Sequence, residues 1–187
     1  MSERRERTSA KKKEINPMVR LTVTLLAIAA VCSLCLGLVN AVTGPIIQNI
    51  QNEKVKAAMA EVLPADSYVE IPYLNESGGP VKAIHMADDK GYVVQVAPSG
   101  FGGLIDMMVG VDNEGKCTGV SIVSMKETAG LGAKASKEDF RAQFVGQGVD
   151  VAVTKDGGKI DALTGATITS RAVADGVAAA IEAVEAL

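Results

Sequence analysis

The sequence predicts an α+β protein in which a single N-terminal transmembrane helix precedes an antiparallel sheet flanked by helices. Residues 21–39 are 19 consecutive residues without a charged side chain. From about residue 65 the chain contains short β-like runs separated by turn residues, without the regular strand and helix alternation of a parallel sheet. A periodic helical segment ends the chain, and residues 65–187 are numerous enough to form one core.

The N-terminal segment, residues 1–20, is basic. It carries seven Arg or Lys residues against three Glu, a net charge of +4, whereas the whole chain is at −3. Residues 21–42 are long enough, at about 1.5 Å per residue, to cross a hydrocarbon core of about 30 Å. Because only the N-terminal flank is basic, the positive-inside rule predicts a cytoplasmic N-terminus and an exported C-terminal part. A membrane span accounts for these charges, so no nucleic-acid partner is expected.

A cleaved signal peptide is the competing interpretation of this segment. Val39-Asn40-Ala41 has the small-residue pattern of a cleavage site, after which the mature chain would begin at Val42. The apolar run is longer than the roughly 7 to 15 residues usual in a signal peptide, which favours a retained anchor.

The cysteines give no clear redox or metal motif. Cys32 and Cys35 form a C-x-x-C inside the apolar run, where small residues pack against neighbouring helices or, alternatively, supply half the ligands of a membrane iron–sulfur centre. Cys117 is the single cysteine of the exported part, so that part has no intramolecular disulfide. With one histidine, His85, expected in a strand to face solvent or a hydrogen-bond partner, neither a metal site nor a hydrolase triad is predicted.

The predicted elements follow in order. Thr43-Gly44-Pro45 is expected to end the span, and residues 43–64 form a connecting segment whose helical pattern stops at Pro64. Ser136 begins a capping-box-like start of a short helix through Phe144. Three antiparallel hairpins are predicted, pairing residues 81–86 with 92–96, 104–111 with 116–124, and 149–154 with a strand at 159–163.

The last predicted element is a turn leading into the C-terminal helix. Its apolar face consists of Val173, Val177, Ala180, Ile181 and Val184. Thr167, Thr169 and Ser170 are all competent N-caps, so the helix start is uncertain by a few residues. The free amides and the positive dipole end of a helix N-terminus favour an anion there. A simple capped helix start remains the alternative.

The turn contains a longer pattern, Asp161-Ala-Leu-Thr164-Gly165-Ala166-Thr167. It resembles the flavinylation motif D-x-x-[ST]-G-A-[TS] of FMN-binding domains in the Rnf and Na⁺-translocating NADH:quinone reductase complexes. The resemblance implies FMN joined to Thr167 by a phosphoester bond, with Asp161, Thr164, Gly165 and Ala166 around the phosphate arm. A phosphodiester keeps one negative charge, which a helix N-terminus stabilises.

Two glycine-rich loops extend the resemblance, although each alone would be read as a turn. Gly100-Phe-Gly-Gly103 matches G-[YF]-G-G, and residues 126–134 match E-T-P-G-L-G with Ala129 where proline is usual. Thr164 likewise stands where serine is common. Phe101 is a candidate to stack on the flavin, but a core position is favoured. The residues of the second loop implied to line the flavin site are Glu127, Thr128, Gly130, Leu131 and Gly132.

The modest length resembles the G subunit of Rnf more than the longer C subunit of the quinone reductase. That family implies electron transfer by covalent FMN in an ion-translocating ferredoxin:NAD⁺ oxidoreductase of the bacterial inner membrane, with no independent catalysis by this chain. The implied partners are the other Rnf subunits, both membrane and iron–sulfur or flavin ones, and a flavin transferase using FAD and Mg²⁺. Residues 65–187 would then be the extracytoplasmic FMN-binding domain. The alternatives are an exported flavin domain serving an extracellular reductase and a non-redox membrane-anchored binding module.

Overall fold

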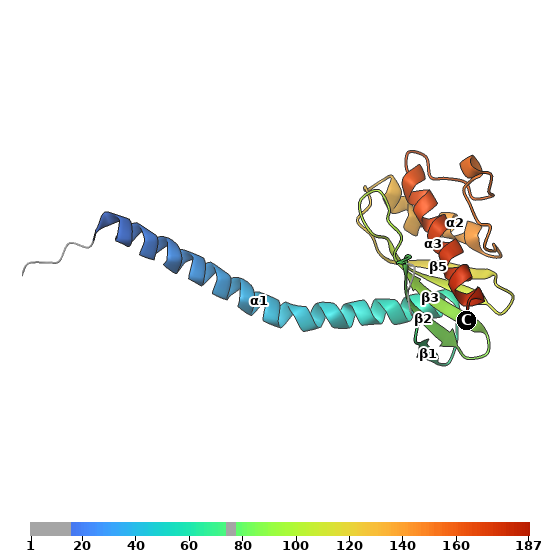
Figure 1. Cartoon of the computed structure of the whole chain (residues 1–187), viewed down its shortest axis with the longest axis horizontal. Coiled ribbons are helices and arrows are strands. Elements are labelled where there is room, and N and C mark those ends of the chain that lie inside the picture. The colour runs from blue at the N-terminus through green and yellow to red at the C-terminus, as the bar shows by residue number, and fades with distance from the viewer. Residues whose placement is uncertain (1–15, 74–77) are drawn as a thin grey trace, which may run out of the picture. The chain divides into compact units, whose positions relative to one another are not determined.

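The computed structural model describes residues 16–73 and 78–187 (Figure 1). The chain divides into two compact units, residues 1–49 and residues 50–187, which are described separately. Residues 1–15, which hold most of the predicted basic segment, lie outside the described residues.

The first unit contains most of a long helix, α1 (Pro17–Val62). The predicted break at Gly44-Pro45 is wrong, because α1 continues through both residues. Proline removes one backbone donor, here the partner of the Ala41 carbonyl, and a helix can accommodate that loss locally. Within the described residues α1 is the one helix long and apolar enough to cross a membrane, and the apolar window that qualifies it is entirely exposed.

Two threonine hydroxyls near the start of the apolar part of α1 are hydrogen-bonded to the helix backbone. The hydroxyl of Thr22 donates to the Met18 carbonyl at 2.9 Å, and that of Thr24 donates to the Arg20 carbonyl at 2.8 Å. A helix in lipid needs such internal partners, since the hydrocarbon offers none. These bonds therefore fit the predicted span.

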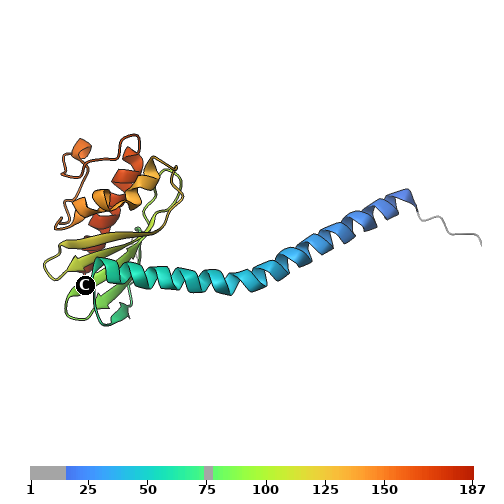
Figure 2. The ribbon, with the colours of Figure 1, turned by 180° about the vertical axis from the view of Figure 1, so that it is seen from behind.

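The second unit is built on a five-stranded antiparallel meander in the order β1-β2-β3-β4-β5, which Figure 2 shows by its colours from green to yellow. The strands are β1 (Tyr68–Ile71), β2 (Val81–Ala87), β3 (Gly91–Val96), β4 (Asp106–Asp112) and β5 (Cys117–Ser124). The first two predicted hairpins are confirmed as β2–β3 and β4–β5.

The third predicted hairpin is wrong. Residues 149–163 form a loop with the short 3-10 helix η3 (Thr154–Asp156) and one isolated parallel bridge between Val153 and Ile160. Gly157 has a φ of +87°, which ends η3 in a left-handed turn. Val153 and Ile160 are buried in the main core. Their apolar side chains therefore anchor the loop to the core and do not mark a strand ladder.

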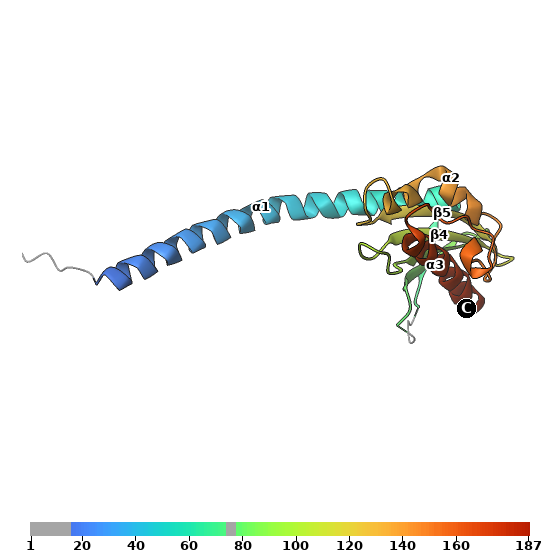
Figure 3. The ribbon, with the colours of Figure 1, turned by 90° about the horizontal axis from the view of Figure 1, so that it is seen from above.

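Helices cover both faces of the sheet, as seen from above in Figure 3. On one face α3 (Thr167–Glu185) buries the predicted stripe, including Val173, Val177 and Ile181, in the main core. On the other face the end of α1 packs against β2, β3 and β4, through Ala58, Met59 and Val62 against Ala87, Val93 and Met108.

Paired glycines let α1 approach the sheet closely. Gly110 of β4 lies opposite Gly119 of β5. A Cβ on Gly110 would lie 2.7 Å from the Val62 carbonyl oxygen, and one on Gly119 would lie 3.2 Å from Val62 Cα. Close packing of the helix therefore accounts for this glycine pair. The compact unit that contains this contact begins at Ile50, inside the predicted connecting segment.

The short helices after β5 are η1 (Gly132–Ser136), α2 (Glu138–Arg141) and η2 (Ala142–Phe144). The predicted capping by Ser136 is wrong, because its hydroxyl donates to the Ala133 carbonyl and Lys137 occupies the cap position of α2 without a side-chain bond. Phe140 and Phe144 are buried in the core and anchor this segment there. Their rings meet edge to face, with the ring centroids 5.4 Å apart.

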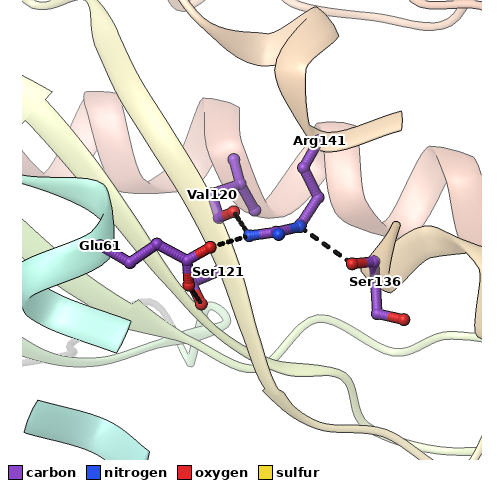
Figure 4. Close-up of polar contacts among 5 residues, drawn as sticks. All are labelled: Glu61, Val120, Ser121, Ser136 and Arg141. Carbon is purple, nitrogen blue, oxygen red and sulfur yellow. Dashed lines mark hydrogen bonds and ion pairs between the residues drawn. The ribbon is translucent and has the colours of Figure 1, made fainter. Parts of the chain in front are cut away.

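A polar cluster joins this segment to α1 and β5 (Figure 4). Arg141 Nη1 donates to Glu61 Oε1 at 2.7 Å and to the Val120 carbonyl at 2.8 Å, while Arg141 Nε donates to the Ser136 carbonyl at 3.0 Å. The Ser121 hydroxyl donates to the other Glu61 oxygen. The hydrogen bonds from Ser121 and then Arg141 lower the pKa of Glu61. The cluster thus keeps Glu61 ionised and fixes the end of α1.

Candidate functional site

Three loops that lie apart in the sequence meet at one end of α3 around a cavity of about 400 Å³. Seven of the ten predicted site residues line it, so the structure brings these seven together. The lining residues are Phe101, Glu127, Thr128, Leu131, Gly132, Gly165, Ala166, Thr167, Ile168 and Thr169.

The turn before α3 has the conformation that places Thr167 at the helix entrance. Gly165 has a φ of +77°, and the Ala166 amide donates to the Leu163 carbonyl at 2.9 Å. Ala166 is the N-cap residue, and among the described residues no side chain caps α3. Thr167 is thus the first helical residue, and the predicted capping roles of Thr167, Thr169 and Ser170 are wrong. The first-turn amides keep the unpaired character that suits an anion.

Ser170 holds the turn from the inside. Its buried hydroxyl donates to the Ala166 carbonyl at 3.0 Å and accepts the Leu163 amide at 3.0 Å. A buried hydroxyl that satisfies two backbone groups is unavailable for covalent attachment. Its role is to shape the turn that presents Thr167.

Glu127 links the three loops. Its Oε2 accepts the Thr169 hydroxyl at 2.7 Å, and its Oε1 accepts the Gly102 amide at 2.9 Å. A Cβ on Gly132 would lie 2.6 Å from Glu127 Oε2, and one on Gly100 would collide with Oε1. At these two positions glycine permits the loops to close around a carboxylate, a packing role that the sequence alone did not indicate.

The cavity walls include exposed apolar side chains. Phe101 is 70% exposed, Ile168 52% and Leu131 43%. The prediction that Phe101 is a core residue is wrong, because its side chain lies on the cavity lining. Exposed apolar groups around a cavity are an expected feature of a site for a flat aromatic ligand.

Three predicted site residues lie off the cavity lining. Thr164 is exposed in the turn, and Gly130 is exposed with a φ of +79° that glycine adopts readily. Asp161 is also exposed, and its backbone amide donates to Gln143 Oε1 at 2.7 Å. Asp161 and Thr164 precede the first residue of α3 in the chain, whereas Gly130 belongs to the second glycine-rich loop.

Lys155 and Ile168 were missed from the sequence, as was the link from Thr169 to Glu127. Lys155 Nζ donates to Thr167 Oγ1 at 3.1 Å from a loop twelve residues earlier. No sequence motif marked it, since a lone lysine in a turn usually faces solvent.

A metal site would need acidic, histidine or cysteine side chains that lie close together. Among residues 16–73 and 78–187, no group of three or more His, Cys, Asp or Glu side chains is arranged to hold a metal. Cys117 is buried, and burial raises the pKa of its thiol to about 12. His85, expected to face solvent or a hydrogen-bond partner, is half-buried, and its Nδ1 atom has no hydrogen-bond partner among the described residues.

The chain is similar to known proteins over most of its length. The FMN-binding domain family matches residues 100–182, which contain all three loops. The chain is 34% identical over 184 residues to the G subunit of an ion-translocating oxidoreductase complex of Methanosarcina acetivorans, covering 93% of this chain and 96% of that one. It is 35% identical to the G subunit of a proton-translocating ferredoxin:NAD(+) oxidoreductase complex of Clostridium ljungdahlii, with 94% and 96% covered.

A further relative is the G subunit of the Na(+)-translocating ferredoxin:NAD(+) oxidoreductase complex of Acetobacterium woodii, at 34% identity with 87% of this chain and 89% of that one covered. Among solved structures, the C subunit of the Na(+)-translocating NADH-quinone reductase of Parabacteroides distasonis is 26% identical. That match covers 55% of this chain and 59% of the other, with a TM-score of 0.46.

Proposed function

Because the chain belongs to the family of G subunits of ion-translocating oxidoreductase (Rnf) complexes, we propose that it transfers electrons through FMN held on Thr167. The complex would couple electron transfer between ferredoxin and NAD⁺ to ion movement across the membrane. This subunit relays electrons and turns over no substrate of its own.

The observation that carries the proposal is the position of Thr167. Its hydroxyl lies on the cavity lining at the first residue of α3, beside backbone amides without a side-chain cap. A phosphodiester at that oxygen would place its negative charge at the positive end of the helix dipole. The hydroxyls of Thr169 and Ser170 are less suited to carry the phosphate, since both residues are buried and hydrogen-bonded within the protein.

The cavity fits the flavin in size and character. A volume of about 400 Å³ lies within the roughly 300–1,000 Å³ of small-molecule sites. Phe101, Leu131 and Ile168 supply the apolar surface that an aromatic ring system needs, and no tryptophan is required.

FMN, when bound, supplies one- and two-electron redox chemistry. The residues of this chain would do the rest: the first-turn amides bind the phosphate, the apolar walls exclude water, and the Glu127–Thr169 hydrogen bond holds the loops around the ring. A covalent bond also prevents loss of the cofactor by mass action where free flavin is scarce.

The proposal extends to maturation and topology. A flavin transferase using FAD and Mg²⁺ would form the bond to Thr167, and Asp161 would serve recognition by that enzyme. The other subunits of the complex would be the redox partners. The N-terminus would lie in the cytoplasm, with α1 as a single span and residues 65–187 on the outer face of a bacterial inner membrane.

Mass spectrometry of the protein from its own membranes tests the proposal. The peptide between Lys159 and Arg171 should carry one FMN mass increment on Thr167, and the intact mass should include α1. A mature N-terminus at Val42 would favour the exported domain of an extracellular reductase. A colourless protein made alongside the transferase would favour a non-redox binding module.

A further inference from the structure

The loop around η3 brings a positive charge to the oxygen that is proposed to carry FMN. Lys155 Nζ donates to Thr167 Oγ1 at 3.1 Å. We propose that Lys155 is the positioning residue for flavin attachment: it orients the Thr167 hydroxyl and neutralises the phosphate that becomes bonded to it. This inference rests on the proposed function and assigns that site a residue outside its sequence motif.

The loop is anchored so that Lys155 stays over the start of α3. Arg171 forms a bidentate ion pair with Asp156. Its Nε donates to Oδ2 and its Nη2 donates to Oδ1, each at 2.6 Å. Arg171 lies four residues after Thr167 and thus one helical turn further along α3. Lys155 and Asp156 are adjacent in the loop. Asp156 binds Arg171 on α3, and Lys155 donates to Thr167 one turn earlier on the same helix.

The backbone of the loop is also well defined. The Thr154 amide donates to the Ile160 carbonyl at 2.8 Å, and the Gly158 amide donates to the Val153 carbonyl at 3.1 Å. A Cβ on Gly158 would collide with the Ala152 carbonyl oxygen, so the loop closes on itself in a way that glycine permits. Lys155 therefore extends from a turn whose backbone is held by hydrogen bonds.

The charge of Lys155 is available to an anion. Lys155 takes part in none of the ion pairs found among the described residues, and the neighbouring carboxylate of Asp156 is engaged by Arg171. The ammonium instead donates to a neutral hydroxyl at a helix N-terminus. A phosphate there would meet the ammonium and the helix amides together.

The attachment step shows where the charge is needed. The Thr167 oxygen attacks the flavin-side phosphorus of FAD, a new P–O bond forms, and the bond from that phosphorus to the AMP oxygen breaks. AMP leaves, and the hydroxyl proton passes to a base of the transferase or to water. No electron transfer is involved. The ammonium of Lys155 would stabilise the charged phosphoryl oxygens during transfer and the phosphodiester afterwards.

The test is flavin incorporation into the full chain in detergent with purified transferase, FAD and Mg²⁺, followed over time by intact mass. Lys155→Met should slow incorporation about tenfold, less than the roughly 10²–10³ of a buried oxyanion donor because this lysine is exposed. Lys155→Arg should restore most of the rate. Lys159→Met, at an exposed lysine of the same loop, is the matched control and should behave as wild type.

A second measurement separates charge from structure. The difference between wild type and Lys155→Met should shrink as salt is raised to about 0.5 M, since added ions screen an exposed charge. Equal unfolding midpoints of the two proteins would show that the variant folds. Wild-type rates for Lys155→Met, or a defect independent of salt, would overturn the role of Lys155 alone. A wild-type chain that takes no flavin on Thr167 would overturn both this inference and the proposed function.

Discussion

The Thr169 hydroxyl donates a 2.7 Å hydrogen bond to Glu127 Oε2, across 42 residues of sequence. Through its other oxygen Glu127 accepts the Gly102 amide, so one carboxylate joins the three loops of the candidate site. The bond is part-buried, and its loss leaves a carboxylate oxygen without its protein partner.

Thr169→Val should therefore destabilise the unit of residues 50–187 without removing flavin attachment. Valine keeps the shape of threonine and deletes the donor to Glu127, which costs about 1.5–3 kcal/mol for a hydrogen bond to a charged group. Urea unfolding monitored by circular dichroism measures the change. Thr128→Val, at an exposed neighbour on the same cavity, should stay within about 0.5 kcal/mol of wild type.

Thr167→Ala should abolish the FMN mass increment and the fluorescence of the denatured protein band. Because Thr167 does not cap α3, its loss should cost less than the roughly 1 kcal/mol of a removed N-cap. Thr164→Ala is the control and should keep at least part of the flavin, since Thr164 lies off the cavity lining. Fluorescence that survives denaturation in Thr167→Ala would refute the attachment site.

Asp161→Asn should fold normally and acquire little flavin. The carboxylate is exposed and outside the cavity lining, so its removal leaves the core intact, while carboxylate oxygen is a preferred Mg²⁺ ligand. Flavin incorporation by the transferase and thermal unfolding should be measured together. Complete incorporation into this variant would leave Asp161 only a structural role.

The outward topology can be tested with an engineered cysteine at Asp89, an exposed turn residue of the β2–β3 hairpin. A membrane-impermeant maleimide should label Asp89→Cys in intact cells with the outer barrier permeabilised, where one is present. Cys117 gives little background, because it is buried with a pKa raised to about 12. Labelling that needs cell lysis would contradict the orientation.

Burial of Cys117 also predicts a pH dependence of stability. Burial holds the thiol neutral in the folded chain by raising its pKa to about 12 from an ordinary 9.0. The unfolded chain then binds fewer protons at alkaline pH, so the stabilisation is complete below about pH 9 and is lost as the pH rises toward 12. From about pH 8 to pH 10 wild type should lose about 1 kcal/mol more than Cys117→Ala in urea unfolding. Parallel losses in the two proteins would contradict this account.

Much of the fold could be predicted because its signals are local. The β2–β3 and β4–β5 hairpins follow from alternating apolar runs around short turns, and the buried face of α3 follows from helical spacing. The apolar stretch of α1 follows from length and composition. The same local rules failed at residues 149–163, where Val153 and Ile160 are buried as loop anchors without a strand ladder.

The sequence by itself determined the identity of the three loops, their order and the family they belong to. Only the tertiary structure decided that Phe101 lies on a cavity, that Glu127 joins Gly102 to Thr169, and that Lys155 reaches Thr167. The physical reason is that such contacts depend on how distant loops pack around α3. The hydrogen-bond partner of a side chain depends on that packing, so the spacing of residues along the chain does not predict it.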